Sequence, residues 1–349
     1  MPKISVVIPV YNGENYLSDC LESLRKQTFS PEEIVVVDNA STDKTKEILE
    51  DFKRKEKKLK VIFNKKNLGY AQASNQGIKE VLKTNPDFIF VLNQDTLCEE
   101  KTLENLAKAA WENNSSVFAW QPLILLWPSK EIVQTMGDRI HFLGFGYSGG
   151  YKKLREEVKN EPQEIPYASG AAMLINVNLL KKVGFFDEIY FLYHEDLDLS
   201  LRASLLGLKI FLAPQAIVYH RYQEKISRSR WYWSERGRII FLLKFYKWPT
   251  LLLIFPFWLL MEIGVWGYSL TNGWFFLKIK SFLSALKNLP QILRSRKILQ
   301  KNRKITDREL FKFLETKFDF AGFTHPLLKY LVNPIFGFFG TFVRNFIFW

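Results

Sequence analysis

Three aspartates stand where apolar runs of the sequence end or begin, and carboxylates in such places can bind ligands or move protons. Asp38 closes the buried run 34–37, and Asp95 follows the buried run 88–92. Asp196 opens a segment with a helical pattern. A carboxylate at a strand end can accept hydrogen bonds from the imide or amide edge of a pyrimidine. The competing role for Asp38 is to cap the helix that follows it.

Asp95 is also the last residue of the triplet Asn93-Gln94-Asp95, which suggests a metal site. A diphosphate leaving group concentrates negative charge, and a divalent cation such as Mg²⁺ or Mn²⁺ with oxygen ligands neutralises it. His220 closes a strand-like run and is a second candidate ligand. The competing interpretations are an ordinary turn for the triplet and a structural histidine.

Asp196 is a candidate general base because of its place on the expected helix 196–206. The apolar positions of this helix share one face: Leu197, Leu201 and Leu205. Asp196 therefore lies off the core face, near the helix N-terminus, where the helix dipole favours the ionised carboxylate. Asp198 is spaced to pair with Arg202. Plain capping of the helix is the alternative role for Asp196.

The elements that must position these residues alternate between strand and helix patterns over the first hundred residues. Strands are expected at residues 4–10, 34–37, 60–63 and 88–92, and helices at residues 17–24, 41–55 and 72–82. This alternation predicts an α/β fold with a mostly parallel sheet between helices. Ligands bind such sheets beyond the carboxyl ends of the strands, where Asp38 and Asp95 are expected. Further strands are expected at residues 117–126 and 216–219, and a loop at residues 137–165.

The composition changes after Trp248 and indicates contact with a membrane. Residues 250–270 contain one charge, Glu262, and are long enough to span a bilayer. Pro256 makes a broken hairpin or an in-plane helix pair equally compatible with the sequence. A basic stretch follows at residues 278–308, and the Phe-rich segment 334–349 resembles an interfacial anchor. A buried helical subdomain is the alternative.

Charge and cysteine content narrow the class of protein. The 349 residues carry a net charge of +13, with 47% hydrophobic and 15% aromatic residues. Basic residues flank the apolar stretches, which favours an anionic membrane surface over a merely solvated face. Nucleic-acid binding is not expected, because no zinc-ligand spacing or arginine-rich tract is found. The two cysteines, Cys20 and Cys98, indicate a reducing compartment, and no signal peptide is expected.

Five segments together resemble the inverting family 2 glycosyltransferases of the GT-A fold, over about residues 3–222. They are residues 6–12, 35–43, 67–78, 184–187 and 195–202, followed by Gly207, Pro214 and His220. The segment 67–78 is similar to the rhamnosyltransferase-like subgroup. The resemblance implies a GT-A catalytic domain over residues 1–225 and a C-terminal, membrane-associated helical region over residues 226–349.

The resemblance also implies roles for individual residues. Pro9, Tyr11 and Asp38 would line the nucleotide, Asp95 would hold the metal and diphosphate, and Asp196 would be the catalytic base. The implied donor-binding residues are Pro9, Tyr11, Asp38, Asn67, Gly69, Asn75, Gln94, Asp95, Gly170 and Ala171. The implied metal ligands are Asp95 and His220. The usual Asp-X-Asp motif begins with Asn93 here, so metal binding depends on one carboxylate.

The expected activity is transfer of a sugar from a nucleoside-diphosphate donor, dTDP-rhamnose or a UDP-sugar. The expected acceptor is a hydroxyl of a lipid-linked or cell-envelope glycan at the cytoplasmic face of the membrane. The chain would be peripheral, monotopic or anchored by a single hairpin. A nucleotidyltransferase is less compatible because no Gly-rich loop follows the first strand. A processive synthase would show a Gln-X-X-Arg-Trp motif, but Ser227 precedes Arg230-Trp231. A non-catalytic membrane scaffold is the remaining alternative.

Overall fold

The computed structural model describes residues 2–112, 116–222, 227–318, 326 and 328–349. It divides into two compact units, which are treated separately below. Unit 1 comprises Met1–Asp138, Ser148–Ala203 and Leu208–Tyr222. Unit 2 comprises Arg139–Tyr147, Ser204–Gly207 and Gln223–Trp349.

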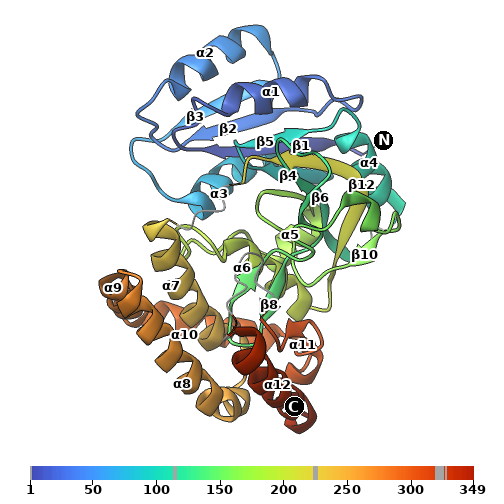
Figure 1. The fold of residues 1–349 in the computed structure, drawn as a ribbon. Coiled ribbons are helices and arrows are strands. Elements are labelled where there is room, and N and C mark those ends of the chain that lie inside the picture. Colours follow the sequence, from blue (N-terminus) through green and yellow to red (C-terminus); the bar gives the residue numbers. More distant parts are fainter. Residues whose placement is uncertain (1, 113–115, 223–226, 319–325, 327) are drawn as a thin grey trace. The chain divides into compact units, whose positions relative to one another are not determined.

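Unit 1 is built on one large mixed sheet with the strand order β10-β12-β6-β11-β4-β1-β2-β3 (Figure 1). Its strands are β1 (Ile4–Val10), β2 (Ile34–Asp38), β3 (Leu59–Phe63), β4 (Phe88–Leu92), β5 (Thr96–Cys98), β6 (Val117–Leu126), β7 (Val133–Thr135), β10 (Gln163–Glu164), β11 (Ala172–Asn176) and β12 (Lys209–His220). The first four pair in parallel, as do β6 and β12, whereas β11 is antiparallel to both of its neighbours.

Helices cover both faces of this sheet because its strands carry apolar side chains on both faces. They are α1 (Leu17–Arg25), α2 (Thr45–Lys55), α3 (Tyr70–Val81), α4 (Thr102–Glu112), α5 (Val177–Val183) and α6 (Glu195–Leu205). One apolar core lies between the sheet and α1, α2 and α4. The other lies between the sheet and α3, α5 and α6. The predicted α/β fold is confirmed.

The parallel register brings the predicted site residues to one edge of the sheet. Val10 pairs with Asp38, so β1 and β2 end side by side. Strand β4 pairs with β1 in the same direction and leads into the triplet that contains Asp95. On the antiparallel side, His220 at the end of β12 pairs with Thr96.

Three local predictions need correction. The helix expected from Ser41 begins at Thr45, because the residues before it form a hydrogen-bonded loop at the sheet edge. The expected loop 137–165 contains β10, the short strands β8 (Arg139–His141) and β9 (Gly146–Tyr147), and a helical turn at Arg155–Glu157. The strand expected at 216–219 is the long strand β12, since pairing with β6 extends it.

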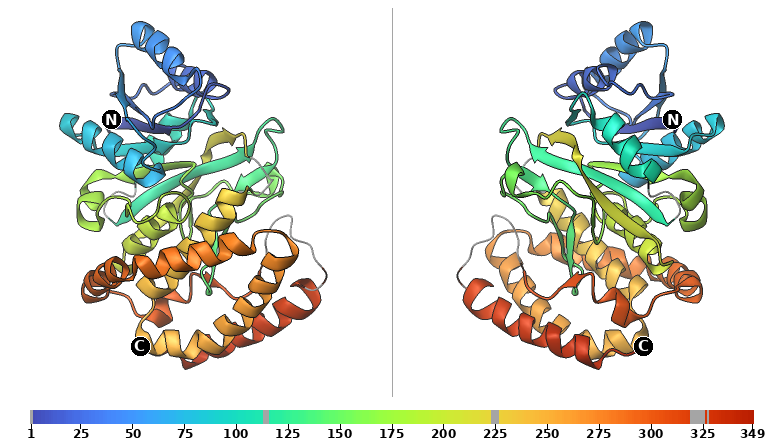
Figure 2. Two further views of the ribbon diagram at one scale, coloured as in Figure 1. Left: turned by 90° about the vertical axis from the view of Figure 1, so that its left-hand side faces the viewer. Right: turned by 90° about the vertical axis from the view of Figure 1, so that its right-hand side faces the viewer.

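Unit 2 is mainly helical (Figure 2). Its helices are α7 (Arg228–Phe245), α8 (Trp248–Thr271), α9 (Phe275–Lys287), α10 (Leu289–Asn302), α11 (Asp307–Leu310) and α12 (Asn333–Phe346), and a small sheet joins β13 (Leu314–Glu315) with β8 and β9. A short 3₁₀-helix occurs at Leu82–Thr84 in unit 1, and a short π-helix occurs at Leu328–Val332 before α12. Helix α8 runs on through Pro256, so the break that the sequence left open does not occur. Among the described residues, α8 alone is long and apolar enough to cross a membrane, judged by length and composition.

Candidate active site

The first part of the site is the paired end of β1 and β2. Asp38 is buried, and its Oδ1 accepts hydrogen bonds from the backbone N–H of Ser41, at 3.2 Å, and from the Ser41 hydroxyl. The Ser41 Oγ in turn accepts from the backbone N–H of Asn12 at 2.8 Å. Because α2 begins only at Thr45, Asp38 is not the cap of that helix. Its carboxylate is instead held by Ser41 at the sheet edge, where Asp38 pairs with Val10, the residue before Tyr11.

Gln94 joins this edge to the triplet that follows β4. Its Oε1 accepts from the Tyr11 N–H at 2.9 Å, and its Nε2 donates to the Tyr11 carbonyl at 3.0 Å. The carbonyl oxygen and the NH2 group of the Gln94 amide therefore both bind the backbone of Tyr11. Tyr11 as a whole residue is 45% exposed, so it is accessible to a planar ligand at this edge.

Asp95 faces His220 across the edge. His220 Nε2 lies 3.2 Å from Asp95 Oδ1, and His220 Nδ1 lies 2.9 Å from Gln134 Oε1. An amide oxygen accepts hydrogen bonds, so Gln134 can accept a proton carried on Nδ1, and Nε2 is the ring nitrogen that faces the Asp95 carboxylate. Burial raises the pKa of Asp95, but the charge and hydrogen bond of His220, a backbone hydrogen bond and the charge of Arg221 together bring the pKa below its ordinary value.

This pair fits a divalent cation. An imidazole nitrogen and a carboxylate oxygen are both ligands of divalent cations, they lie 3.2 Å apart here, and the Gln134 contact on Nδ1 is the kind of outer contact that orients a histidine ligand. In the part of the chain that the structure describes, no group of three or more His, Cys, Asp or Glu side chains is arranged to hold a metal. Two protein ligands with phosphate oxygens and waters completing the shell is a usual arrangement for Mg²⁺.

Asp196 occupies the N-terminal turn of α6 and accepts two backbone hydrogen bonds. Its Oδ2 accepts from Gly170 N at 2.8 Å, and its Oδ1 accepts from Leu197 N at 2.7 Å. Tyr193 and His194 precede it with positive φ angles of 63° and 72°, an uncommon backbone for residues other than glycine that accumulates at functional sites. Burial raises the pKa of Asp196, although both N–H donors oppose the rise.

Glu195 has a different electrostatic setting from its neighbour. Burial, and then the negative charge of Asp196, raise the pKa of Glu195 well above its ordinary value. Two adjacent carboxyl groups with different hydrogen bonding tend to divide the protonated and ionised roles. The two N–H donors favour the ionised form of Asp196, whereas the pKa of Glu195 is raised well above its ordinary value.

The backbone of Gly170 and Ala171 connects the two halves of the site. The Ala171 carbonyl accepts from Asn93 N at 2.9 Å, so this segment touches both Asp196 and the triplet. The Tyr70 hydroxyl donates to the Gly170 carbonyl at 2.6 Å. A continuous series of hydrogen bonds thus leads from Asp196 to the strand end that carries Asp95.

Asn67, Gly69 and Asn75 are predicted donor-binding residues, and the side chains of Asn67 and Asn75 hydrogen-bond to nearby backbone groups. The Asn67 Oδ1 accepts hydrogen bonds from Gly69 N and from Asn39 Nδ2, both at 2.9 Å. Asn75 exchanges hydrogen bonds with the backbone of Phe186 at 2.9 and 3.0 Å. These side chains shape the loop and the start of α3, and so position Tyr70.

Asp198 pairs with Arg202 at 2.7 Å, as the i, i+4 spacing predicts. Arg202 also donates to the carbonyls of Val183 and Phe185, at 2.7 and 2.6 Å. This buried pair anchors α6 to the segment before it.

Three residues of the site were missed by sequence reasoning. Tyr70 lies in the segment 67–78 and Glu195 in the segment 195–202, both of which resemble family motifs, so their positions in the sequence could have identified them. Gln134, which orients His220, comes from β7, and no local pattern distinguishes it.

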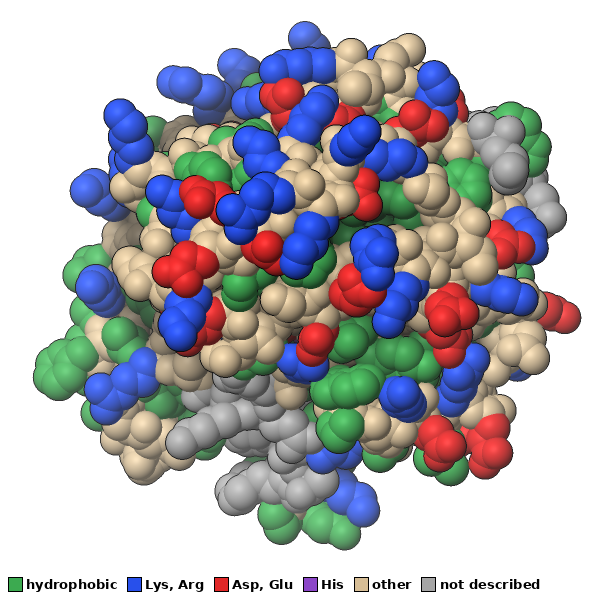
Figure 3. Space-filling model, turned by 90° about the horizontal axis from the view of Figure 1, so that it is seen from above, with side chains coloured by type: hydrophobic (Ala, Val, Ile, Leu, Met, Phe, Trp, Pro, Cys, Tyr) green, Lys and Arg blue, Asp and Glu red, His purple; other side chains and the backbone are tan. Residues whose placement is uncertain are grey.

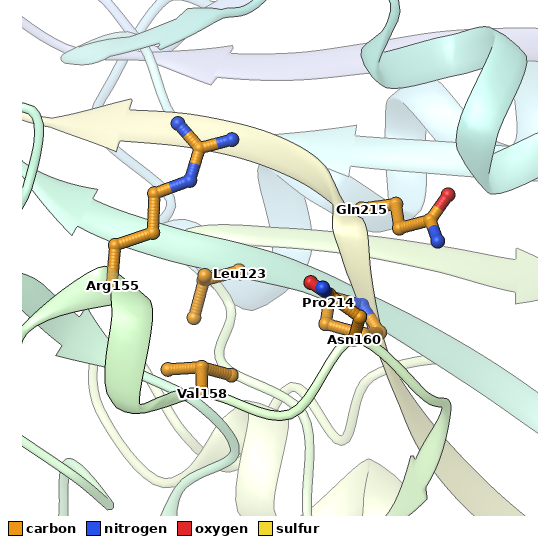
Figure 4. Close-up of a pocket in the computed structure, with 6 residues that line it drawn as sticks. All are labelled: Leu123, Arg155, Val158, Asn160, Pro214 and Gln215. Atoms are coloured by element: carbon orange, nitrogen blue, oxygen red, sulfur yellow. The ribbon is translucent and has the colours of Figure 1, made fainter.

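A separate cavity of about 150 Å³ lies beside the middle of β12 (Figure 4). It is lined by Leu123, Arg155, Val158, Asn160, Pro214 and Gln215. None of these is a predicted site residue.

Comparison with known proteins identifies the family. A model described as glycosyl transferase family 2 matches residues 5–184, more than half of the chain. Glycosyltransferase GlyG of Streptococcus pneumoniae serotype 4 is 27% identical over 231 residues, covering 65% of this chain and 73% of that protein. Glycosyltransferase GlyA of the same organism is 28% identical over 223 residues, covering 62% of this chain but only 29% of GlyA.

Solved structures show the same fold. GalNAc-T7, solved with UDP, GalNAc and Mn²⁺, aligns with a TM-score of 0.57 and 19% identity, covering 71% of this chain and 49% of that one. S. aureus TarS 1–349, solved with UDP, aligns with a TM-score of 0.50 and 23% identity, covering 98% and 90%. The chain belongs to glycosyl transferase family 2 and has the GT-A fold, with a helical region at its C-terminus.

Proposed function

We propose that this chain is an inverting glycosyltransferase that moves a sugar from a pyrimidine nucleoside-diphosphate donor to a hydroxyl group. The observation that carries the proposal is the continuous set of contacts along one sheet edge. It joins the paired strand ends at Asp38 and Tyr11, through Gln94, to Asp95, and from there to Asp196. Family membership favours this activity over a nucleotidyltransferase or a scaffold.

The donor nucleotide would lie at the end of β1 and β2. Asp38 would accept hydrogen bonds from the base, Pro9 would lie beneath it, and the exposed Tyr11 ring would pack on its face. A donor of this kind includes dTDP-rhamnose and the UDP-sugars. Gly170 and Ala171 would border the sugar, because their backbone lies between the triplet and Asp196.

Asp95 and His220 would hold a divalent metal, Mg²⁺ or Mn²⁺, against the diphosphate. When bound, the metal neutralises the charge that develops on the leaving diphosphate. Gln134 would keep the His220 Nε2 directed at this position.

Asp196 would remove the proton of the acceptor hydroxyl. The acceptor oxygen then forms a bond to the anomeric carbon as the bond from that carbon to the diphosphate oxygen breaks. One displacement inverts the anomeric configuration, and no covalent enzyme intermediate forms. The raised pKa of Asp196 makes its carboxylate a stronger base than an ordinary aspartate.

The acceptor would be a lipid-linked or cell-envelope glycan, reached at the cytoplasmic face of the membrane. The apolar helix α8 supports contact with a membrane. Residues 1–225 would form the catalytic domain, and residues 226–349 would form the region that meets the membrane.

Nucleotide binding tests the donor site. Thermal stabilisation of the purified chain is measured with UDP, dTDP, GDP and ADP, each with and without Mn²⁺. A pyrimidine diphosphate should stabilise the chain most, more strongly with Mn²⁺, and Asp38→Asn should remove the preference for a pyrimidine. Equal stabilisation by all four nucleotides, or by none, would contradict the assignment of Asp38.

A further inference from the structure

The positive charge of the chain is concentrated in its C-terminal part. Residues 228–349 contain 20 Lys and Arg but only six Asp and Glu. The preceding 227 residues contain 29 Lys and Arg and 30 Asp and Glu, so they are close to neutral. Figure 3 shows Lys and Arg interspersed with Asp and Glu on the face seen from above. A basic helical unit is therefore attached to a nearly neutral catalytic unit.

Helix α8 has two sharply different faces. One face packs inside unit 2 and includes Thr250, Ile254 and Ser269. The opposite face is apolar along the length of the helix: Leu252, Phe255, Leu259, Leu260, Ile263 and Leu270 are exposed. A helix that crosses a bilayer as an independent span would present apolar groups around its whole circumference.

Glu262, the single charge of α8, lies on the packed face within a buried cluster of four charges. Arg238 of α7 and Lys278 of α9 each pair with both Glu262 and Glu235. The separations include 3.0 Å for Arg238–Glu235 and 2.8 Å for Lys278–Glu262. Two cations balance two anions, so the cluster is neutral and ties the middle of α8 to both neighbouring helices.

The neighbouring helices are too polar to follow α8 into a hydrocarbon core. Helix α7 carries five Lys and Arg in 18 residues, and α9 carries three Lys in 13 residues. Charged groups at the bilayer centre are costly, and the two helices could leave the core only if the four-charge cluster broke. The cluster therefore favours an orientation of α8 along the membrane surface.

Helix α12 enlarges the apolar face, and the helices beside α8 add charge. The Phe257 and Phe339 rings lie 4.3 Å apart, so α8 and α12 are in contact. Phe338, Phe342, Phe346 and Phe348 are exposed at this end of the chain. The exposed side of α9 alternates apolar and basic residues: Phe276, Lys280, Leu283 and Lys287. Helix α9 also contacts α8, since the Phe275 and Trp266 rings lie 5.5 Å apart. Exposed apolar residues with basic residues near them are typical of helices that lie in an anionic lipid interface.

We infer that unit 2 is a monotopic membrane anchor, in which the exposed faces of α8 and α12 lie in the plane of an anionic lipid surface and neither helix crosses it. The apolar side chains would enter the headgroup and upper acyl layer. The basic residues of α9 and α10 would contact the lipid phosphates. This inference refines the membrane location in the proposed function by specifying how the chain meets the lipid.

Flotation with lipid vesicles tests binding. The full chain should float with phosphatidylcholine vesicles that contain phosphatidylglycerol, and less with phosphatidylcholine alone. Ile263→Glu, at a position 65% exposed on α8, should lower the vesicle partition coefficient about tenfold. Trp111→Glu is the matched control, because Trp111 is 62% exposed but belongs to unit 1. It should bind vesicles like the unmodified chain.

Depth measurement separates the in-plane orientation from a span. Leu252→Cys, Ile263→Cys and Leu270→Cys are labelled one at a time with a fluorophore, since the native cysteines Cys20 and Cys98 are both buried. Quenching by lipids with spin labels at shallow and deep positions should place all three probes at the same shallow depth. In a span, positions 252 and 270 would be about 27 Å apart along the helix axis, near opposite surfaces, with 263 deep.

Each contrary outcome overturns the inference in a recognisable way. A deep probe at 263 with shallow probes at 252 and 270 would show a span. Loss of self-association in Ile263→Glu, with no vesicle binding by the unmodified chain, would show that the face joins two copies. Nucleotide stabilisation in detergent does not depend on lipid, so it reports separately on the proposed transferase activity.

Discussion

Asp196 and Glu195 are neighbours in the chain, yet their surroundings prepare them for different tasks. Asp196 accepts two backbone N–H donors that stabilise its charge, whereas Glu195 is buried and keeps a strongly raised pKa. These surroundings are the reason that the proposed function assigns the role of base to Asp196 rather than to Glu195.

Replacing each carboxyl group by its amide should separate these tasks. Asp196→Asn should lower kcat by about 10²- to 10⁴-fold, since it removes the base, while donor affinity changes little. Glu195→Gln should retain most of kcat, because an amide resembles the protonated acid. Steady-state kinetics and donor titration measure both. Equal losses in the two variants would contradict the assignment of the base.

The same assignment predicts the direction of the pH dependence. A base must be ionised, so kcat/KM should fall as the pH drops through the pKa of Asp196. Because burial raises that pKa, the fall should begin above the ordinary aspartate range near 3.9. A pH–rate profile between pH 4 and 9 measures it. An acid limb at the ordinary aspartate pKa would show that another group limits the rate.

At the scale of single elements, Gly69 sets the start of α3. Its φ is +83°, and a Cβ at this position would lie 2.4 Å from the Phe191 carbonyl oxygen. That carbonyl accepts from Tyr70 N at 2.7 Å, so the crowding lies at the point where Tyr70 is positioned.

Gly69→Ala should therefore lower the free energy of unfolding by more than backbone strain alone. Gly207→Ala is the matched control, because Gly207 has a φ of +76° but no atom within 4 Å of an added Cβ. Gly207→Ala should lower the free energy of unfolding by about 1 kcal/mol, and Gly69→Ala should lower it by clearly more. Urea denaturation measures both. Equal losses would show that the contact with Phe191 relaxes without cost.

The four-charge cluster makes a second prediction at this scale. Lys278→Met leaves an uncompensated buried carboxylate and should cost about 3 to 5 kcal/mol of stability. Lys278→Met combined with Glu262→Gln restores neutrality and should cost less than the sum of the two single changes. Thermal and urea unfolding measure the difference. Additive losses would show that the two side chains are not coupled.

The strands and most helices could be predicted from the sequence, because their apolar periodicity is local. Residues 88–92 and 117–126 were expected as strands, and β4 and β6 occupy those positions. The start of α2 could not be predicted, because Ser41 is held by Asn12, a residue 29 positions away. The same limit applies to Gln134, whose contact with His220 spans 86 positions.

Over the whole molecule, unit 1 is nearly neutral and contains the residues of the proposed donor site. Unit 2 is basic and contains the proposed lipid-binding helices. The apolar character of residues 250–270 was visible in the sequence, but the burial of Glu262 was not. Its partners, Arg238 and Lys278, come from helices on either side of α8 in the chain. Pairing of this kind depends on tertiary packing, which periodicity does not encode.

The division of the chain into two units predicts that lipid binding and nucleotide binding can be changed independently of each other. Ile263→Glu should leave nucleotide stabilisation unchanged, since Ile263 belongs to unit 2 and the residues of the proposed donor site belong to unit 1. Thermal shift with UDP or dTDP in detergent measures this. A lost nucleotide response in a variant that still unfolds cooperatively would show that the units depend on each other.

Donor turnover tests the central claim most directly. The purified chain, in mild detergent, is presented with a panel of nucleotide sugars that includes dTDP-rhamnose and several UDP-sugars, with and without Mn²⁺. Release of the nucleoside diphosphate is measured for each donor. The proposed function predicts metal-dependent release from one pyrimidine donor, which Asp196→Asn reduces by orders of magnitude. Release from no donor, or release unaffected by Asp196→Asn, would contradict it.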